Sequence, residues 1–534
     1  MKKRKDSPSQ EEMNEIESLY KSNKLDVLEE KTKQLISNYP NFSILFNILG
    51  SVLYKKGHYK ESISNFNEAI KLNPNFYFAY NNLGNSLKAL GKYQESINSY
   101  EKALKINPNY FEAYSSLGMS LLEVEKIEEA ILCQKKALKI NPKYADAHNN
   151  LGILLARSGK YEESIIHLKN ALEIKPDYAE VYSNLGASLT EIGRYEDAIK
   201  NYQRALKLNP KYTEAHFNES TIRLMNGEFE IGWQKYEYRF DKNFITKMRY
   251  DTNKIWDGNY LNGTLLVWAE QGIGDHILFA SMILDLKKYA KNIILEIDIR
   301  LVELFKRYCD KINFSNIKIV GLKKELLKDF DKHIAIGSLG RYLRKSIKSF
   351  TTTPKKYLIS SSKKEEEIKK KFLSNGKFKV GISWKTLNKK QQYRNILLEQ
   401  MLPILSVSNC EFINLQFGQT SEDLKNFMSK HKISIKTIDE IDNYNDIESL
   451  AALVNCLDLV ITIQNSTAHL AGALGKKTWM LLAKNARWHW LVNQNKSLWY
   501  PSVKLFRQEN IGDWNNIINN ISIDLESLSK IKKN

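Results

Sequence analysis

The chain has 534 residues, of which 43% are hydrophobic and 26% are charged. A length of this order predicts about two to four globular domains. The composition excludes a wholly disordered or collagen-like chain, and the absence of a run of about 20 apolar residues excludes a hydrophobic membrane-spanning helix. The basic first residues precede no apolar stretch, so we expect no secretory signal. Four scattered cysteines match neither a disulfide framework nor a metal-ligand spacing, which favours a cytoplasmic location.

Charge is distributed unevenly along the chain. Residues 1–246 carry a net charge of +2 (34 basic and 32 acidic side chains), whereas residues 247–534 carry +17 (46 basic and 29 acidic). We expect the basic half to meet an anionic partner, such as a phosphorylated small molecule or a membrane surface touched peripherally. A solvated lysine-rich surface is the alternative. The basic residues are not interleaved with an aromatic platform or a reading helix, so we expect no nucleic-acid binding.

Prolines reveal a repeat in the first half. Six of the ten prolines recur every 34 residues, at Pro40, Pro74, Pro108, Pro142, Pro176 and Pro210. Glycines keep the same interval from Gly50 to Gly186, as do alanines from Ala69 to Ala205. Small residues let two helices approach closely, and proline ends the second helix. A 34-residue period of helix–turn–helix units is typical of tetratricopeptide repeats.

The period divides the first half into segments. After a disordered basic N-terminus at residues 1–8, the repeat region covers residues 9–246. It comprises repeats at 9–42, 43–76, 77–110, 111–144, 145–178 and 179–212, followed by a capping helix pair at 213–246. The sequence therefore predicts an N-terminal all-α solenoid.

Asparagines recur on the first helix of several repeats, at Asn81, Asn82, Asn149, Asn150 and Asn184. A row of carboxamides on a concave face would hold the backbone of an extended peptide through paired hydrogen bonds. A polar, solvated face is the alternative. We expect a protein or peptide partner on the concave face of the repeats.

Beyond Trp256 the repeat pattern gives way to alternating strand and helix patterns. The apolar segment Leu265 to Trp268 precedes a turn, Glu270 to Asp275, and apolar residues then follow at helical spacing over about 276–289. Further strands are predicted near 292–297, 316–320 and 333–336. A strand, a glycine-rich turn and a helix open a doubly wound α/β domain, whose ligands bind at the carboxyl ends of strands.

A second α/β unit follows a polar, lysine-rich bridge at about 350–377. Its predicted strands are Lys379 to Trp384, Phe412 to Gln416, Leu459 to Ile463 and Thr478 to Leu482, with a helix at 466–474. Two α/β lobes that face each other across a cleft are typical of GT-B glycosyltransferases and of other two-lobed binding proteins. Periodicity alone does not separate these classes.

Two motifs carry a resemblance to a known family. Leu266 to Trp268 with Gly274-Asp275, and the segment Ser466 to Gly475 (STAHLAGALG), resemble glycosyltransferase family 9, the heptosyltransferase-like group of GT-B fold. Trp488, Trp490 and Trp499-Tyr500-Pro501 match the tail of proteins in which tetratricopeptide repeats precede such a domain. The order of parts is also similar to that of the O-linked N-acetylglucosamine transferases.

The resemblance implies an α/β GT-B-like two-lobed domain after the solenoid. Its N-terminal lobe, on the acceptor side, would cover residues 247–350, and its C-terminal lobe, on the nucleotide-sugar side, residues 379–534, with an inter-lobe linker at 351–378. Such an enzyme moves a sugar from a nucleotide-diphosphate sugar, its co-substrate, to a protein or glycan acceptor that the repeats select. No Asp-x-Asp motif stands at a strand end, so we expect an inverting, metal-independent reaction without a further cofactor.

The same resemblance assigns the donor-binding residues Arg394, Gln416, Phe417, Asn465, Ser466, Thr467 and His469. Arg394 matches a basic phosphate ligand and would offset the charge of the leaving diphosphate. The nearby Lys385, Lys389 and Lys390 are candidates to share this task, and a solvated loop is the alternative for each of them. Ser466 and Thr467 begin a helix, where free backbone N–H groups and the helix dipole favour a diphosphate. The alternative role of Ser466 is a plain helix N-cap.

Asp275 matches the general base of the family, which takes the proton from the acceptor hydroxyl as the sugar is attacked. Its alternative role is a helix N-cap beside Gly274. Glu270 and His276 are alternative bases within the same turn.

Gln464 departs from the family, which usually has aspartate immediately before the Asn465-Ser466-Thr467 segment. Loss of that carboxylate implies altered sugar recognition or a weakened enzyme. The second hypothesis is therefore a tetratricopeptide interaction scaffold with a catalytically inactive glycosyltransferase-like domain. Gln464 favours this hypothesis and the intact Gly274-Asp275 pair opposes it.

Overall fold

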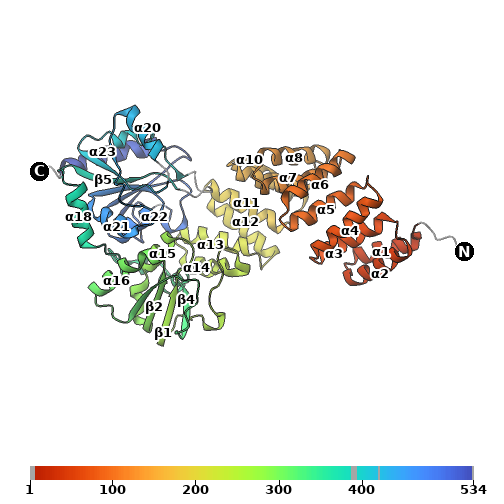
Figure 1. Ribbon diagram of the computed structural model, residues 1–534, viewed down its shortest axis with the longest axis horizontal. Helices are drawn as coiled ribbons and strands as arrows, with labels where there is room; N and C mark the ends of the chain where they lie inside the picture. Colours follow the sequence, from red (N-terminus) through yellow and green to blue (C-terminus); the bar gives the residue numbers. More distant parts are fainter. Residues whose placement is uncertain (1–6, 387–393, 419–420, 493, 532–534) are drawn as a thin grey trace. The chain divides into compact units, whose positions relative to one another are not determined.

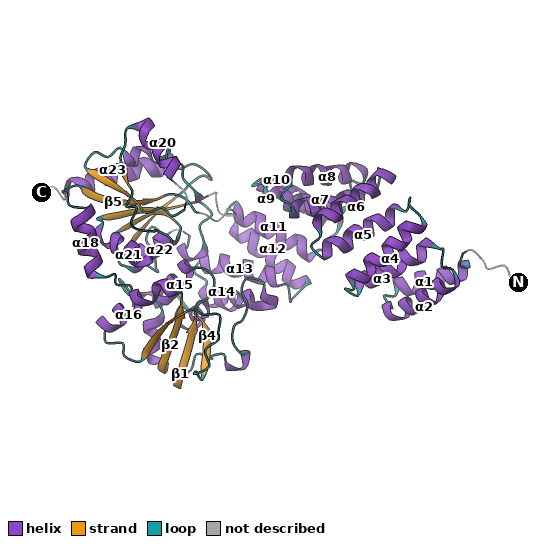
Figure 2. Cartoon of the chain, viewed as in Figure 1, coloured by secondary structure: helices purple, strands orange, loops and turns teal. Residues whose placement is uncertain are grey.

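The computed structural model describes residues 7–386, 394–418, 421–492 and 494–531 of the chain. It divides into two compact units, Met1–Pro210 and Lys211–Asn534. Figure 1 follows the chain from red to blue, and Figure 2 shows that the first unit is built from helices while both sheets belong to the second unit. Among the described residues, no helix is both long enough and apolar enough to cross a bilayer.

The first unit is a solenoid of antiparallel helix pairs, and each pair lies within one of the expected 34-residue segments. The pairs are α1 (Gln10–Lys21) with α2 (Leu25–Asn38), α3 (Ser43–Lys55) with α4 (Tyr59–Leu72), α5 (Tyr77–Ala89) with α6 (Tyr93–Ile106), α7 (Phe111–Glu123) with α8 (Ile127–Ile140), α9 (Ala145–Arg157) with α10 (Tyr161–Ile174), and α11 (Ala179–Glu191) with α12 (Tyr195–Leu208).

Glycine permits the close approach of the two helices of a pair. A Cβ atom added at Gly84 on α5 would lie 2.6 Å from the ring of Tyr100 on α6, and one added at Gly152 would lie equally close to Leu168. Tyr100 and Leu168 are fully enclosed. The repeating glycine therefore holds the large side chain of the second helix against the backbone of the first.

The first helices of neighbouring repeats contact each other more extensively than the second helices do, so they form the inner face of the solenoid. Polar side chains link them: the Asn82 amide donates to Asn47 Oδ1 (3.0 Å) and the Asn184 amide to Asn149 Oδ1 (2.9 Å). The Asn150 amide likewise donates to Ser115 Oγ (3.0 Å). Most of the asparagine row therefore forms cross-repeat hydrogen bonds within the protein, whereas the buried Asn81 Oδ1 has no hydrogen-bond partner among the described residues.

The helix pair at 213–246 differs from our expectation of a cap on the solenoid. Its helices α13 (Thr213–Met225) and α14 (Phe229–Tyr236), with the 3-10 helix η1 (Glu237–Asn243), belong to the second compact unit. Trp233 on α14 is fully enclosed, donates its indole N–H to the Arg344 carbonyl (2.8 Å), and covers Gly340 on α17 (Gly340–Leu343). Burial of this large ring attaches the pair to the α/β part.

The first α/β lobe contains a four-stranded parallel sheet in the order β3-β2-β1-β4. Its strands are β1 (Leu261–Trp268), β2 (Ala290–Ile297), β3 (Ile317–Gly321) and β4 (Lys332–Ala335). Leu265 to Trp268 are fully buried, as expected for a parallel sheet covered on both faces.

The helix predicted at 276–289 is wrong in its limits. The α-helix α15 covers Ile273–Ala280, and a 3-10 helix, η3 (Ile283–Lys288), follows it. The Asp275 carboxylate accepts from the Gly272 backbone N–H (3.3 Å) and so caps the helix at its earlier start. The Ser281 hydroxyl donates to the Leu278 carbonyl (2.7 Å), a side-chain bond that competes with helix continuation.

The second lobe contains a six-stranded parallel sheet in the order β10-β9-β8-β5-β6-β7. Its strands are β5 (Phe378–Ser383), β6 (Cys410–Asn414), β7 (Ile435–Lys436), β8 (Leu459–Ile463), β9 (Thr478–Leu482) and β10 (Val503–Arg507). This is the strand order of doubly wound nucleotide-binding domains. The sequence does not predict the edge strands β7 and β10, because β7 is very short and β10 alternates with charged residues.

The lysine-rich bridge contains buried residues and a helix. Tyr357 and Leu358 are buried, and the backbone N–H groups of both donate to the Ala473 carbonyl at the end of α22 (Ser466–Ala473). The rest of the bridge forms α18 (Ser362–Phe372), which packs on α21 (Ile447–Cys456) of the second lobe. One buried cluster extends through both lobes and the α13–α14 pair.

We predict that Gly84→Ala destabilises the solenoid. Alanine raises helix propensity by about 1 kcal/mol, but its methyl group would overlap an enclosed ring, and such overpacking costs about 1–3 kcal/mol. The helical unfolding transition in urea, followed by circular dichroism, should move to lower urea concentration. Asn98→Ala, at an exposed position of α6, is the matched control. An unchanged Gly84→Ala midpoint would contradict the packing argument.

Candidate functional site

The second unit has a topological switch point in each sheet, where ligands of open α/β folds bind beyond the carboxyl ends of the strands. In the second lobe the switch lies between β5 and β8, and in the first lobe it lies between β1 and β4. Helices α15 and α22, which follow β1 and β8, contact each other. The two switch points therefore bring the Glu270 to Asp275 turn near the Gln464 to Thr467 turn.

Asn465 organises the turn after β8. It is the N-cap of α22, and its amide donates to Ser383 Oγ at the end of β5 (2.7 Å), while its Oδ1 accepts from the Thr462 hydroxyl (3.2 Å). The alternative role of Ser466 as N-cap is therefore wrong, because Ser466 is the first helical residue. Thr467 is buried one residue further into the first turn of the helix.

Gln464 is buried at the end of β8, with 6% of its surface exposed. Its Oε1 accepts from the backbone N–H of Arg487 (3.2 Å), and its Nε2 has no hydrogen-bond partner among the described residues. A buried donor without a partner costs free energy. Gln464 thus offers an unused amide donor at the end of β8.

His469 lies on the side of α22 that faces the first lobe. A Cβ atom at Gly274 would lie 3.0 Å from its ring, and its Nδ1 is paired with the Tyr500 hydroxyl at 2.8 Å. Burial, with a smaller contribution from the Arg487 charge, lowers the pKa of His469 to about 3. The imidazole is therefore neutral at physiological pH and serves as a hydrogen-bonding group.

Arg394 is buried with 5% of its surface exposed, and its charge contributes to the lowered pKa of the enclosed His489, which burial dominates. This electrostatic effect brings Arg394 into the neighbourhood of the turn that also carries Arg487. Lys389 and Lys390 lie outside the described residues. Lys385 is described and pairs with Asp423 on α20 (Ser421–His431) at 3.0 Å.

Gln416 uses its side chain to shape the loop after β5. Its Oε1 accepts from the Trp384 and Lys385 backbone N–H groups (3.0 and 2.9 Å) and from the Ser383 hydroxyl. Its Nε2 donates to the Lys385 and Phe417 carbonyls. The amide is fully engaged within the protein, so it positions the loop.

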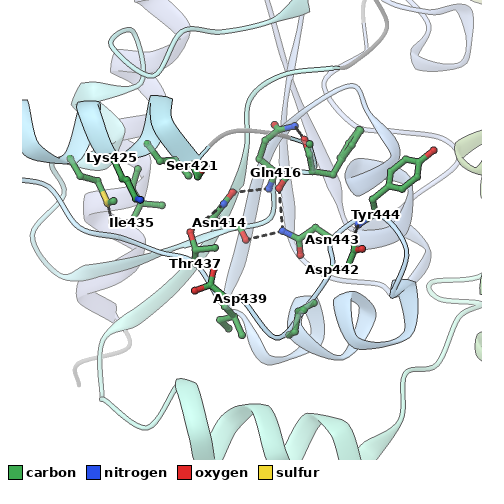
Figure 3. A pocket seen from close by; sticks show the side chains of 16 residues that line it. Asn414, Gln416, Ser421, Lys425, Ile435, Thr437, Asp439, Asp442, Asn443 and Tyr444 are labelled. Carbon is green, nitrogen blue, oxygen red and sulfur yellow. Dashed lines mark hydrogen bonds between the residues drawn. The ribbon is translucent and has the colours of Figure 1, made fainter.

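A pocket of about 490 Å³ lies beyond the carboxyl ends of β6 and β7. Figure 3 shows Asn414 and Gln416 on one side and the segment from Thr437 to Tyr444 on the other. The Asn443 amide donates to the Asn414 and Gln416 carbonyls (3.3 and 3.2 Å) and joins the two sides. The volume falls in the range of small-molecule sites, about 300–1,000 Å³.

The aromatic side chains of this pocket are partly open. The Phe417 and Tyr444 rings stand 6.1 Å apart, and Tyr444 is 54% exposed. Arg300 of the first lobe donates to the Tyr444 carbonyl (2.8 Å) and lies over its ring. The first lobe therefore contacts the Tyr444 segment that lines this pocket.

Asp275 belongs to the turn after β1 in the first lobe, and its carboxylate lies close to Arg487 of the second lobe. Burial raises the pKa of its carboxyl group, while the Arg487 charge and the Gly272 N–H act in the opposite direction. The Arg487 Nη1 and Asp275 Oδ1 atoms are 3.6 Å apart. A half-buried carboxylate of raised pKa has the properties of a general base. The alternative role of Asp275 as the helix N-cap is wrong, because Gly272 is the N-cap of α15 and Asp275 supports the helix start from the third helical position.

Glu270 does not have the surroundings of a free base. Its side chain is fully enclosed, and Arg239 on η1 donates to both carboxylate oxygens, with the shortest contact at 2.7 Å. Arg239 also donates to the Ser338 hydroxyl (2.7 Å) beyond β4. The ion pair thus occupies the switch point of the first lobe.

His276 is buried, and its Nδ1 accepts from the Asp298 backbone N–H (3.3 Å), while its Nε2 has no partner among the described residues. Burial lowers the pKa of His276 to about 4.

Sequence reasoning missed Arg239 and Arg487. The tail motif with Trp488 pointed to the neighbourhood of Arg487, and no sequence signal marked Arg239. No group of three or more histidine, cysteine or acidic side chains stands ready for a metal ion among the described residues.

Comparison with known families identifies the repeats. Residues 143–211 match a family described as "Tetratricopeptide repeat", and residues 50–91, 84–124 and 120–159 match one described as "TPR repeat". The repeats are tetratricopeptide repeats. Modules of this kind present extended concave surfaces to partners, and their presence supports a protein partner for this chain.

Similar proteins share the repeats or part of the chain. Protein FlbA of Caulobacter vibrioides is 29% identical over 316 residues, which are 55% of this chain and 52% of FlbA. The chain therefore spans about half the length of this curated relative. A thermophilic TPR protein of Thermus thermophilus is 25% identical, with a TM-score of 0.32 over 34% of this chain and 99% of its own. YrrB, a TPR protein with an unusual peptide-binding site, is 21% identical, with a TM-score of 0.28 over 34% and 95%.

We predict that His276 makes the stability of the second unit depend on pH. Its pKa is about 4 in the folded protein and about 6.5 in an unfolded chain. The unfolded chain therefore binds a proton that the folded protein does not between pH 6.5 and 4, and the free energy of unfolding falls as pH is lowered through this window. In His276→Asn, whose Oδ1 still accepts from Asp298, this fall should be smaller in urea titrations. His58→Asn, at an exposed repeat turn, should keep the wild-type pH dependence; equal slopes for all three proteins would contradict the assignment.

Proposed function

We propose that the second unit is a GT-B-type glycosyltransferase domain that moves a sugar from a nucleotide-diphosphate sugar to an acceptor chosen by the repeats. One observation supports this most strongly: Asp275, a carboxylate of raised pKa on one lobe, faces the helix-start turn and the cation of Arg487 on the other lobe. A base opposite an anion-binding helix terminus is the arrangement that transfer from a diphosphate leaving group requires.

The diphosphate and the nucleoside of the donor would bind at two different places in the second lobe. Its diphosphate would lie at the first turn of α22, where Ser466 and Thr467 leave backbone N–H groups unpaired within the helix. Its nucleoside would occupy the pocket beyond β6 and β7, where Tyr444 offers a ring for stacking and the exposed Asp439 offers a carboxylate for ribose hydroxyls. Gln416 would act by positioning the loop between these parts.

In the reaction, Asp275 would accept the proton of the acceptor hydroxyl as its oxygen attacks the anomeric carbon. The bond from that carbon to the diphosphate oxygen breaks on the opposite side, so the configuration inverts. Charge on the departing diphosphate would be offset by the N-terminus of α22 and by the buried guanidinium of Arg394.

The acceptor would be a protein segment held by the repeats. Asn82, Asn150 and Asn184 each form one cross-repeat hydrogen bond through the amide N–H₂. A carboxamide has two donors and a carbonyl acceptor, so each keeps capacity for the backbone of an extended peptide. These bonds also fix the direction in which the amides point, which lowers the entropy cost of binding.

The scaffold hypothesis is favoured by Gln464, which replaces the carboxylate usual in the family. A thermal-shift screen of the full chain against nucleotide-diphosphate sugars separates the hypotheses at the first step, because a ligand that binds only the folded state raises the melting temperature. Donor binding followed by transfer to a protein acceptor supports the enzyme. Binding without transfer to any acceptor supports a sugar-nucleotide-binding scaffold.

We predict that Asp275→Asn abolishes most of the transfer without weakening donor binding. Asparagine keeps the size and much of the capping capacity of aspartate but cannot accept a proton. Loss of a general base lowers the rate by about 10²–10⁴-fold. The turnover rate should fall while the affinity for the donor, measured by calorimetry, does not. Glu270→Gln tests the alternative base: full loss there with retained activity in Asp275→Asn would move the base to Glu270.

We also predict that Tyr444→Ala weakens nucleotide binding. Stacking of a base on an aromatic ring is worth about 1–3 kcal/mol, or roughly five- to 150-fold in affinity. Calorimetry against a panel of nucleoside diphosphates measures the loss. Tyr260→Ala, which removes a 64% exposed ring from the first lobe, is the control. Equal affinities in both variants would remove the pocket from the donor site.

A further inference from the structure

Arg487 lies on the loop between β9 and the 3-10 helix η8 (Trp488–Trp490). Its backbone N–H donates to Gln464 Oε1 (3.2 Å) and so ties this loop to the end of β8. The side chain is 38% exposed. The loop therefore brings a partly open guanidinium to the switch point of the second lobe, beside the first turn of α22.

The guanidinium lies among several groups of the site. It pairs with Asp275 across the two lobes at 3.6 Å. Its charge also contributes to the lowered pKa values of His469 and His489, after burial. One cation of the second lobe thus acts on both the carboxylate of the first lobe and the histidines of the second.

The ion pair with Asp275 is loose. A charge-assisted N–H···O bond between arginine and a carboxylate is about 2.7–2.9 Å long, and the Arg487 guanidinium makes no hydrogen bond with any side chain or backbone of the described residues. Arg239, by comparison, directs its guanidinium to Glu270 and three further groups. The N–H groups of the Arg487 guanidinium are therefore available to a ligand. Their planar arrangement suits the oxygen atoms of a phosphate group.

We propose that Arg487 serves the two halves of the site in turn: it neutralises Asp275 in the free protein and binds the donor diphosphate when the donor is present. This inference deepens the proposed function and rests on it. Arg487 is then a donor-binding residue, and through Asp275 it also controls when the base becomes active. Because the guanidinium is shared, donor binding precedes proton removal from the acceptor.

Among the groups that surround Asp275, Arg487 is the one whose positive charge can move from the carboxylate to a ligand. Glu270 from the same turn is neutralised by Arg239, and His469 from α22 is neutral. The hydroxyls of Tyr236 from α14 and Tyr500 from the second lobe are also within electrostatic reach and uncharged. Loss of the Arg487 charge would raise the pKa of Asp275 further, because that charge opposes the effect of burial.

The first test uses inorganic pyrophosphate as the probe and needs no activity. In the full chain, Arg487→Met should weaken pyrophosphate binding about ten- to hundredfold, the loss of a hydrogen bond to a charged group. Lys477→Met removes one exposed cation from the opposite end of β9 and should change affinity little. Equal affinities in Arg487→Met and Lys477→Met would overturn the proposal. Melting temperatures verify that each variant is folded.

A double-mutant cycle then tests the sharing of the guanidinium. Asp275→Asn frees Arg487 and should tighten pyrophosphate binding, and this gain should shrink in the Arg487→Met background. A gain of the same size in both backgrounds means that the two side chains act independently, and the exchange is then wrong. The outcome does not depend on transfer, so absence of any transfer would contradict the proposed function while leaving the cycle interpretable.

The pH dependence of kcat/KM adds a second measurement. If Arg487 had only a structural role, its replacement would not shift this pH profile. The acid limb reports the pKa of the free base. It should shift to higher pH in Arg487→Met, because the cation that opposes protonation is gone, and Arg487→Lys should stay near the wild type. An acid limb at the same pH in all three proteins would overturn the role of Arg487 toward Asp275.

Discussion

The second unit depends on the buried ion pair between Arg239 and Glu270. Glu270 lies just beyond the first strand of the first lobe, and its enclosed carboxylate requires a cation that water cannot replace. That cation comes from η1, which follows the α13–α14 helix pair. Removing one partner of such a pair costs about 3–5 kcal/mol, so the helix pair and the switch point of the first lobe form together. Gln271 strengthens the link, since its amide donates to the Tyr236 hydroxyl (3.0 Å).

The same helix pair also supports the opposite side of the site. The backbone N–H of Val492 donates to the Met225 carbonyl at the end of α13 (3.0 Å), and the Trp233 and Trp488 rings meet edge to face, 5.3 Å apart. The turn that carries Asp275 and the turn that carries Arg487 are thus fixed to one pair of helices. Their distance is determined by that common support together with the contact of α15 with α22.

Sequence reasoning locates the parts of the structure that follow from local patterns. The proline interval defines the helix pairs, and runs such as Leu459 to Ile463 define the central strands, because both patterns record burial within a few residues. It fails where partners are distant in the sequence. The sequence shows Tyr357 only as part of a polar, lysine-rich bridge, because its partners, Ile277 and Ala473, belong to separate lobes. Arg239 and Arg487 are missed for the same reason. Asp275 and Asn465 are found because each lies in a short sequence motif, and the structure places both at the start of a helix.

The boundary after Pro210 falls at the end of a repeat, while the helix pair beyond it belongs to the α/β unit. Tandem 34-residue segments of similar sequence are prone to unequal recombination, which adds or deletes whole repeats. Such an event would leave the reading frame, the side chains that join α13 and α14 to the lobes, and the turns at the switch points unchanged. Related chains can therefore differ in the length of the surface offered to a partner while the candidate site of the second unit is inherited unchanged.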